Sequence, residues 1–316
     1  MSHNSASPGS THVHSADPEV LYRHGLTVDT REPHLRGVLL DTLATPGSLT
    51  RLRLGLLAGE VMGLASDATR AMATALEYFH TASLLFDDLP CMDDARERRG
   101  RPCPHHTYGE AATILGALAF INRAYGLLWQ AFAAAPESGR HAAAAHVQRC
   151  LGAAGVLHGQ SIDLHFSTGD TSSRAVAHAA LGKTVSLLRL TLVTPALLVG
   201  ASAREKLLLN RLSVYWGLAY QTADDCTDVA PGSAAPAKTS GRDFARGRPN
   251  FALAAGFDAT ASRLDHLLAL VRKTWAELIS VRSGWHALGP LIIRLNQAVV
   301  MAAHSLPAEN ASARCA

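Results

Sequence analysis

Residues 71–94 read AMATALEYFHTASLLFDDLPCMDD, and they decide how the rest of the chain is interpreted. Their first part is mostly apolar or small and rich in Ala and Leu, which is typical of a helix buried on much of its circumference. Carboxylates then follow at Asp87, Asp88, Asp93 and Asp94. Acidic groups at the C-terminal end of a helix oppose its dipole and repel one another, so this placement lowers stability and indicates a function.

The same texture extends through the chain and predicts a bundle of helices. Ala and Leu dominate from residue 35 onward, β-branched alternation is scarce, and Gly/Pro clusters recur only at wide intervals. No change in composition divides this body, so we expect one large all-α domain over residues 34–316. The expected helices are 35–45, 50–64, 67–89, 108–134, 139–166, 173–200, 203–229, 250–256, 259–280 and 285–305.

Composition excludes several classes of protein. The 316 residues are 48% hydrophobic and 17% charged with a net charge of +3, which does not fit a disordered or nucleic-acid-coating chain. The most apolar stretch, 185–201, is interrupted by Arg189 and Pro195, so no membrane span is expected. Five scattered cysteines and the lack of a signal sequence favour a reducing cytoplasm. Residues 1–33 are rich in Ser, His, Pro and Gly, and we expect a disordered leader there.

A second acidic cluster lies on one face of a predicted helix. In WGLAYQTADDCTD, residues 216–228, the polar positions Gln221, Asp224, Asp225 and Asp228 follow i, i+3, i+4 and i+7 spacing. Their oxygen atoms suit a hard divalent cation, and magnesium is the usual ion beside phosphates. The absence of His and Cys from the stripe argues against zinc.

Basic residues follow each acidic cluster. The segment 96–102 reads RERRGRP, the segment 238–248 reads KTSGRDFARGR, and Lys183-Thr184 interrupts a further apolar helix. Alternating acidic and basic groups around one cavity would bind a metal-complexed diphosphate. Magnesium would bridge the carboxylates and the diphosphate, and Lys or Arg would neutralise the remaining phosphate oxygens.

These motifs resemble those of the trans-polyprenyl synthetase family. FHTASLLFDDLPCMDDARERRGRP (79–102) is similar to the first aspartate-rich motif, GLAYQTADDCTDV (217–229) to the second, and KTSGRDFARGRPNF (238–251) to the loop that follows it. HGQSIDL (158–164) and GKTVSLLRL (182–190) lie in the expected order between them. The resemblance implies an isoprenoid-synthase helical bundle, a homodimer, and three magnesium ions. The implied activity is a short-chain prenyltransferase that condenses an allylic prenyl diphosphate with isopentenyl diphosphate, giving geranylgeranyl diphosphate.

The resemblance also implies roles for individual residues. Asp87 and Asp93 would ligate two magnesium ions with support from Asp88, and Asp224 would hold the third with help from Asp225 and Asp228. The residues that would face the allylic diphosphate are Arg98, Lys183, Thr184, Gln221 and Lys238. Those that would hold isopentenyl diphosphate are Arg53, His80 and Arg99.

The prenyl tail is expected to run along the helix that carries the first motif. One turn before Asp87, the small residues Ala82 and Ser83 would form the floor of its pocket, and Phe79 is an alternative floor a further turn away. Small residues there favour a geranylgeranyl over a farnesyl product.

Several positions depart from the family pattern. In GSLTRLRL (47–54), Arg51 and Arg53 remain, but Thr50 stands where a Lys is expected and Leu54 where a Pro is expected. These changes affect mainly the site of the second substrate. Two alternatives therefore stay open: a terpene cyclase or unusual prenyltransferase that ionises a prenyl diphosphate on the same fold, and a non-catalytic partner subunit of another synthase.

Overall fold

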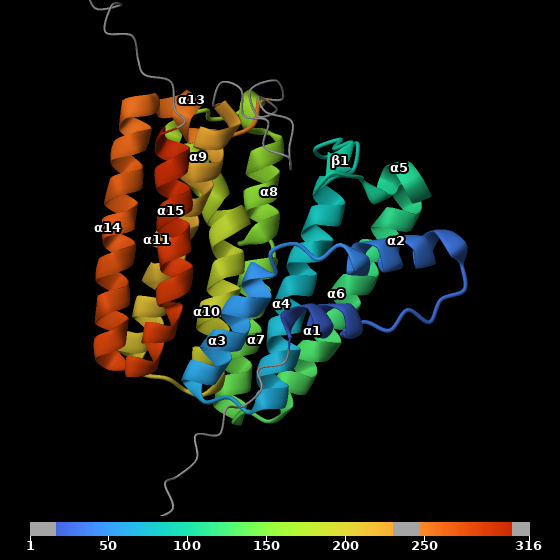
Figure 1. The fold of residues 1–316 in the computed structure, drawn as a ribbon, viewed down its shortest axis with the longest axis horizontal. Coiled ribbons are helices and arrows are strands. Elements are labelled where there is room, and N and C mark those ends of the chain that lie inside the picture. The colour runs from blue at the N-terminus through green and yellow to red at the C-terminus, as the bar shows by residue number, and fades with distance from the viewer. Residues whose placement is uncertain (1–16, 230–246, 305–316) are drawn as a thin grey trace, which may run out of the picture.

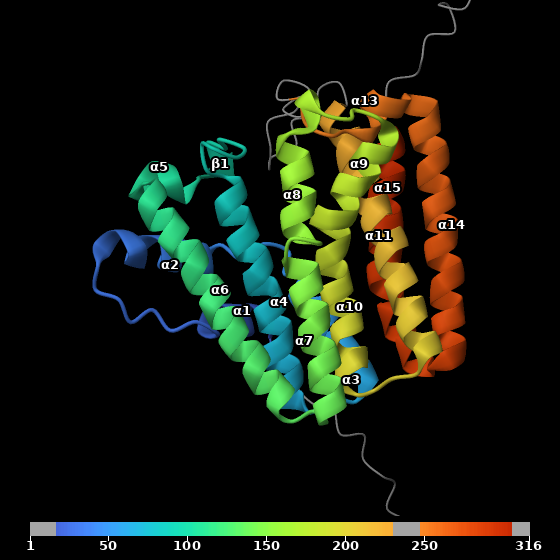
Figure 2. The ribbon, with the colours of Figure 1, turned by 180° about the vertical axis from the view of Figure 1, so that it is seen from behind.

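The computed structural model describes residues 17–229 and 247–304. Long helices lie side by side through this part of the chain, and the short hairpin of β1 (Glu97–Arg98) and β2 (Arg101–Pro102) lies at one corner (Figures 1 and 2). The all-α bundle predicted from the sequence is confirmed.

The α-helices follow the predicted order closely. They are α1 (Pro18–His24), α2 (Pro33–Ala44), α3 (Thr50–Met62), α4 (Ser66–Asp87), α5 (Pro104–Tyr108), α6 (Glu110–Ala133), α7 (Glu137–Leu151), α8 (Val156–Leu164), α9 (Ser173–Ala180), α10 (Ser186–Leu198), α11 (Ala203–Val229), α13 (Phe251–Ala255), α14 (Phe257–Val281) and α15 (Gly289–His304). A π-helical turn, Leu181–Val185, joins α9 to α10, and 3-10 turns occupy Phe166–Thr168 and Ser283–Leu288.

Part of the predicted leader is ordered, which corrects the expectation for residues 17–33. Asp17 caps α1 by accepting from the N–H of Glu19 at 2.9 Å, and Pro18 occupies the first turn. Tyr22 is buried and packs edge-on against Tyr78 of α4, with ring centroids 5.5 Å apart. One buried aromatic anchors the helix, and a seven-residue helix is too short to show an apolar period. Residues 1–16 lie outside the described part of the chain.

Two predicted helices are interrupted. The span 139–166 divides into α7 and α8 at a turn that begins with Gly152 and ends with Gly155. The span 173–200 is continuous but contains the π-helical turn, which inserts an extra residue around Lys183. Neither the turn between Gly152 and Gly155 nor the π-helical turn changes the apolar character of the surrounding sequence, so hydrophobic periodicity does not reveal these interruptions.

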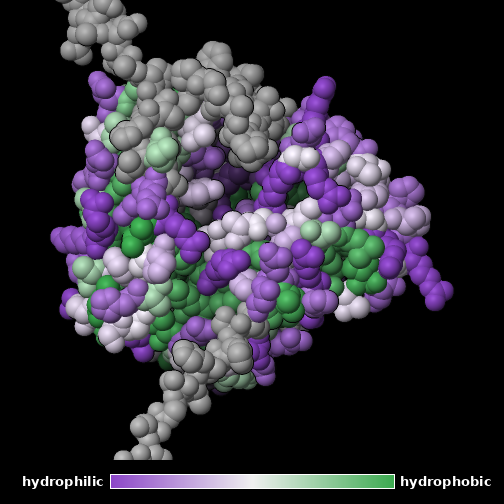
Figure 3. Space-filling view, in the orientation of Figure 1, coloured by the Kyte–Doolittle hydropathy of each residue, from purple (hydrophilic) through white to green (hydrophobic). Residues whose placement is uncertain are grey.

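The core consists of two main apolar clusters. One joins α4, α6 and α7 around Tyr78 and Phe120, and the other joins α3, α10, α11 and α14 around Trp216 and Trp285. The C-terminal ends of α4 and α11 lie at the same end of the bundle (Figure 1). Figure 3 shows a hydrophilic recess at this end, between the main bundle and the side that carries β1 and β2.

Two helical spans are long and apolar enough to cross a membrane by length and composition alone: Glu110–Ala133 and Ser173–Leu198. In the second, 78% of the most apolar window is buried inside the protein, as expected for a core helix. In the first, 44% is buried, and several large apolar side chains on the helix are exposed.

Candidate active site

The end of α4 brings the first group of carboxylates together. The helix ends at Asp87, and the chain then turns back, so that the N–H of Asp93 donates to the carbonyl oxygen of Asp87 at 2.8 Å. Pro90 lies within this turn, and the residue before a proline avoids the helical conformation. The turn places Asp93 beside Asp87, whereas six residues of regular helix would rotate it by about 240°.

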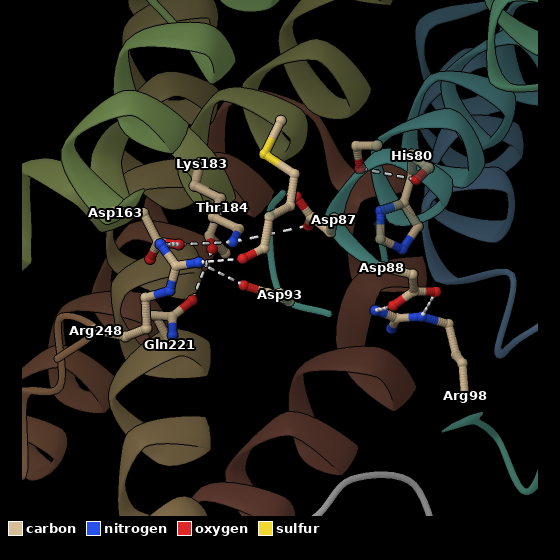
Figure 4. A network of polar contacts seen from close by, with 12 residues as sticks. His80, Asp87, Asp88, Asp93, Arg98, Asp163, Lys183, Thr184, Gln221 and Arg248 are labelled. Atoms are coloured by element: carbon tan, nitrogen blue, oxygen red, sulfur yellow. Dashed lines mark hydrogen bonds and ion pairs between the residues drawn. The ribbon is translucent and has the colours of Figure 1, made fainter. Parts of the chain in front are cut away.

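Lys183 lies between two carboxylates from different helices. Its Nζ is 3.7 Å from Oδ2 of Asp87 and 3.2 Å from Oδ2 of Asp163 on α8 (Figure 4). Burial raises the pKa of Asp87 to about 6, against the opposing effect of the Lys183 ammonium. Burial alone would lower the pKa of Lys183, but Asp87 and Asp163 raise it above its ordinary value, so the amine is charged.

Arg248 adds a second cation to the same cluster. Its Nη2 donates to the carbonyl oxygen of Met92 at 2.7 Å and to Oδ1 of Asp93 at 3.0 Å, and its Nη1 lies 3.8 Å from Asp163. The side chain is only 10% exposed. A segment that follows α11 therefore contacts the turn that follows α4, and acidic and basic groups alternate across this end of the bundle (Figure 4).

The stripe on α11 has two kinds of members. Gln221 accepts from Oγ1 of Thr184 at 2.8 Å and donates to Oδ1 of Asp225 at 3.0 Å. Asp225 is 1% exposed, and its Oδ2 accepts from the N–H of Phe251 at 2.8 Å, so it connects α11 to the start of α13. Asp224 is exposed on the same helix. Asp225 thus orients Gln221, whereas the Asp224 carboxylate is accessible to a ligand.

Asp88 and Arg98 form a pair of their own. Arg98 donates Nε and Nη2 to the two carboxylate oxygens of Asp88 at 2.7 and 2.6 Å. Asp88 is 1% exposed, and the pair lies on the other side of the α4 end from Lys183 (Figure 4). Asp88 therefore fixes Arg98 rather than facing the Lys183 cluster.

A separate basic group surrounds the loop before α3. Arg53 donates Nε to the carbonyl oxygen of Ser48 at 3.3 Å, and Arg99 donates to that of Thr45 at 3.1 Å. A Cβ at Gly47 would overlap the Arg99 guanidinium, so a larger residue there would displace this exposed side chain from the loop. Burial lowers the pKa of His80 well below its ordinary value, and neighbouring arginines add to the effect, so the ring is neutral.

Two glycines bring α8 and the π-helical turn into backbone contact. A Cβ on Gly159 would overlap the backbone of Gly182 and Lys183, and a Cβ on Gly182 would lie 2.5 Å from the Cα of Gly159. This contact sets Asp163 beside Lys183. The π-helical turn contributes to the same placement, because its extra residue rotates Lys183 relative to the helices on either side.

The predicted chain-length residues lie on different sides of α4. Counting back from Asp87 at about 100° per residue, Ser83 lies about 40° away, Phe79 about 80° and Ala82 about 140°. Ala82 is 1% exposed in the core, whereas Ser83 is half-buried. Phe79 packs edge-on against Tyr125 of α6, with ring centroids 5.1 Å apart.

Sequence reasoning missed Asp163, Arg248 and Tyr125. Asp163 and Arg248 lie in HGQSIDL (158–164) and KTSGRDFARGRPNF (238–251), and their charge within those segments is the available signal. Tyr125 carries no such signal, because an aromatic residue on an apolar helix is usually core. Lys238 lies outside the described residues.

The donor set suits magnesium held jointly by protein and substrate. Among the described residues, no three His, Cys, Asp or Glu side chains gather into a ready-made metal cage. Asp87, Asp93 and Asp224 instead offer carboxylate oxygens at two places on one end of the bundle. Magnesium commonly takes one or two carboxylates and fills its shell with water and phosphate oxygens, so these residues fit it.

Comparisons with known proteins identify the family of this chain. The sequence model of the family described as polyprenyl synthetase matches residues 32–282. Geranylgeranyl diphosphate synthase of Pantoea ananas is 34% identical over 205 residues, which cover 64% of this chain and 68% of that protein. The chloroplastic geranylgeranyl pyrophosphate synthase of Capsicum annuum is 32% identical over 216 residues, covering 68% of this chain and 58% of that protein. This chain thus matches less than two thirds of the length of the plant protein.

A solved structure shows the same fold. The geranyltransferase from Helicobacter pylori complexed with magnesium and isoprenyl diphosphate superimposes with a TM-score of 0.76 over 88% of this chain and 92% of that chain, at 22% identity. The family match spans both acidic clusters and the helices that hold them. This chain therefore belongs to the polyprenyl synthetase family and has the isoprenoid-synthase fold.

Proposed function

We propose that this chain is a short-chain trans-prenyl diphosphate synthase that condenses an allylic prenyl diphosphate with isopentenyl diphosphate to give geranylgeranyl diphosphate. The observation that carries the proposal is the position of Lys183 between Asp87 and Asp163, with Arg248 reaching Asp163 and Asp93. Such a cluster can hold a diphosphate and its metal ions together. The names of the relatives, geranylgeranyl diphosphate and pyrophosphate synthases, support the product.

Magnesium would be held by carboxylates of both clusters. Asp87 and Asp93 would ligate two ions and Asp224 the third, with Asp228 assisting and Asp225 acting through the position of Gln221. When bound, the ions supply positive charge that stabilises the departing diphosphate. The contacts of Asp225 with Gln221 and Phe251 support its indirect role.

The protein's own cations and hydrogen-bond donors would bind the allylic diphosphate. One side of its site would consist of Lys183, Thr184 and Gln221. Arg248 would add a guanidinium to the residues predicted from the sequence. We propose the same contact for Lys238, and for Arg98 from the other side of the α4 end, where Asp88 holds it. As the diphosphate leaves, these groups stabilise its charge while the apolar wall along α4 excludes water from the allylic cation.

The second substrate would bind at the basic group before α3. Arg53 and Arg99 flank the loop at Gly47, and neutral His80 can donate one hydrogen bond to a diphosphate oxygen without adding charge. The isopentenyl double bond would then attack the cation, and a proton would be lost to the released pyrophosphate.

The growing tail would run along the Ser83 and Phe79 side of α4. Tyr125, in contact with Phe79, borders an apolar cavity of about 440 Å³ between α6 and α7 that Leu128, Trp129 and Val147 also line. Small Ser83 leaves the route open past the first turn, which supports a product of geranylgeranyl length over farnesyl.

We propose that the active molecule is a homodimer formed through α6. This helix exposes a row of large apolar side chains, and monomers rarely leave such a row uncovered. Its exposed apolar residues are Ile114, Leu115, Leu118, Tyr125 and Trp129. A second copy would present the same row and cover it.

We also propose that residues 34–316 form one catalytic domain and that the enzyme acts in the cytoplasm. The four described cysteines, Cys91, Cys103, Cys150 and Cys226, are free thiols, as is usual in a reducing compartment.

The proposed function is tested by a product analysis. The purified chain is incubated with magnesium and each allylic diphosphate, with and without isopentenyl diphosphate, and the products are identified by mass spectrometry. The proposal predicts elongation to geranylgeranyl diphosphate only when isopentenyl diphosphate is present. Cyclic products from an allylic diphosphate alone would indicate a terpene cyclase, and no product in either case would indicate a non-catalytic subunit.

A further inference from the structure

Glu77 is a buried carboxylate that none of the roles above uses. It lies on α4, is 4% exposed, and belongs to the apolar core between α3 and α4. Burial raises the pKa of Glu77, while the Arg51 charge and backbone N–H groups of Leu52 and Arg51 oppose the shift. A carboxylate in this position destabilises the fold unless those contacts compensate it.

The contacts of Glu77 complete the first turn of α3. The helix starts after Leu49, which has a left-handed backbone with φ of 51° and no side chain that caps the helix. The N–H of Leu52 donates to Oε2 of Glu77 at 2.8 Å. The first N–H groups of a helix have no partner within it, so a carboxylate from α4 here replaces the missing cap.

Close packing of the two helices brings Glu77 to this turn. A Cβ at Gly55 would lie 3.1 Å from Ala73, and a Cβ at Gly59 would lie 2.6 Å from Thr69, so larger residues would push α3 away from α4. Leu52 is fully buried in the same apolar cluster as the α4 residues Ala73 and Leu76. The first turn of α3 is thus held against α4 on one side and is open to solvent at Arg53 on the other.

The turn held by Glu77 is the one proposed to face the second substrate. Arg53 extends from it over the loop at Ser48, and His80 lies one helical turn beyond Glu77 on α4. Arg51 lies inside, where its charge acts on both Glu77 and His80 and its Nε has no hydrogen-bond partner in the described structure. Arg51 therefore balances Glu77, which leaves Arg53 to face outward.

We propose that Glu77 is a positioning residue for the isopentenyl diphosphate site, which it serves by holding the Thr50–Arg53 turn of α3 in place. The inference rests on the proposed function. Thr50 carries no charge that could add a contact of its own, so the site depends more strongly on a correctly placed Arg53.

The test compares Glu77→Ala, Glu77→Asp and Glu77→Gln with the control Glu60→Gln, which changes an exposed glutamate on α3. The KM for each substrate is measured with the other at saturation, and thermal unfolding is recorded for each protein. Glu77→Asp keeps the charge but withdraws the oxygen from Leu52. Glu77→Gln keeps an acceptor oxygen at the same reach.

The proposal predicts that Glu77→Ala and Glu77→Asp raise the KM for isopentenyl diphosphate by about tenfold or more, the size expected for losing a hydrogen bond to a charged group. The KM for the allylic diphosphate stays within about twofold. Glu77→Gln raises the KM for isopentenyl diphosphate less than Glu77→Ala does, because it retains the acceptor for Leu52 although it loses the charge opposite Arg51. If Glu77→Ala does not fold, the Asp and Gln variants carry the test.

Two results would overturn the proposal. Equal changes in both KM values, or no change beyond that of Glu60→Gln, would mean that Glu77 acts only on stability, and the proposed function would stand. A wild-type protein that neither turns over nor binds isopentenyl diphosphate in calorimetry would remove the proposed function and the role of Glu77 with it.

Discussion

Lys183 balances the charge of the candidate site at the scale of single residues. Asp87 and Asp163 both reach its ammonium group, and Asp87 is buried enough that its pKa rises to about 6. The charged form of such a buried carboxylate is stabilised when a further cation approaches. The residue types therefore favour a ligand that brings both magnesium and phosphate.

Thr50→Lys is expected to lower the KM for isopentenyl diphosphate. A new ammonium–phosphate contact contributes about 1.5–3 kcal/mol, or less if the site stays hydrated, and about 1.4 kcal/mol corresponds to tenfold. Thr50 is half-buried beside Ser48, so the longer side chain can reach the loop without disturbing the core. Steady-state kinetics with isopentenyl diphosphate as the varied substrate measure the effect, and an unchanged or raised KM would place the second diphosphate elsewhere.

His80 is expected to make stability depend on pH in the acid range. Its folded pKa lies well below the ordinary value of 6.5, so below about pH 6.5 the unfolded chain binds a proton that the folded protein does not. Its contribution to stability is therefore fully present above about pH 7 and falls as pH drops toward 5.

Urea unfolding of His80→Gln between pH 5 and 8 tests this prediction. The variant should lose part of the fall in stability at low pH, whereas His141→Gln, which changes an exposed histidine on α7, should keep the wild-type profile. Identical slopes in all three proteins would mean that His80 is not the group responsible.

At the scale of elements, sequence could predict α4 and α11 but not the contacts that join their ends to other segments. The apolar runs and the i, i+3, i+4 and i+7 stripe specify both helices, because periodicity is local. Asp163 reaches Lys183 only because Gly159 and Gly182 allow close backbone contact, and Arg248 reaches Asp93 from 155 residues further along the chain. Asp225 belongs to the predicted stripe, yet its partner Phe251 lies on another helix, so its role became visible only in three dimensions.

The rotation of α4 gives a prediction about product length. Ser83 lies on the Asp87 side of the helix and Ala82 about 140° away from Asp87, so Ser83→Tyr should shorten the product toward farnesyl diphosphate. Ala82→Tyr changes the face that the proposed route does not use, so it should leave the product length unchanged and lower stability by about 1–3 kcal/mol through overpacking. Mass spectrometry of products from both folded variants separates the two faces, and an unchanged distribution in both would mean that the tail runs elsewhere.

The whole molecule keeps its acidic site at one end and an uncovered apolar row along one side. Figures 1 and 2 show α6 and α15 on opposite sides of the bundle. Glu205 on α11 accepts hydrogen bonds from Arg282 and Trp285, which connects α11 to the segment after α14. The fold class could be predicted because Ala- and Leu-rich texture extends over most of the chain. The order of α1 could not, because it depends on one tyrosine that packs against a distant helix.

The proposed dimer predicts different effects for two matched substitutions. Trp129→Glu places a charge in the exposed row of α6, where Trp129 is 72% exposed, and should convert a dimer to a monomer. Ile293→Glu places the same charge on α15, where Ile293 is 54% exposed, and should leave the dimer intact. Sedimentation analysis of both proteins gives the answer, and a monomeric wild type or a dimeric Trp129→Glu would contradict the proposed interface.

In the proposed function, carboxylates at the ends of α4 and α11 act together on a metal-bound diphosphate. Its most direct test is the magnesium-dependent release of pyrophosphate by the wild type, Asp87→Ala and Asp224→Ala, with allylic and isopentenyl diphosphates present and thermal unfolding recorded for each protein. We predict that either substitution lowers turnover by at least about a hundredfold. Unfolding temperatures should fall little. Burial disfavours the Asp87 carboxylate, as its raised pKa shows, so its removal also removes an unfavourable charge, and Asp224 is exposed. Near-normal turnover in either folded variant would contradict this joint action.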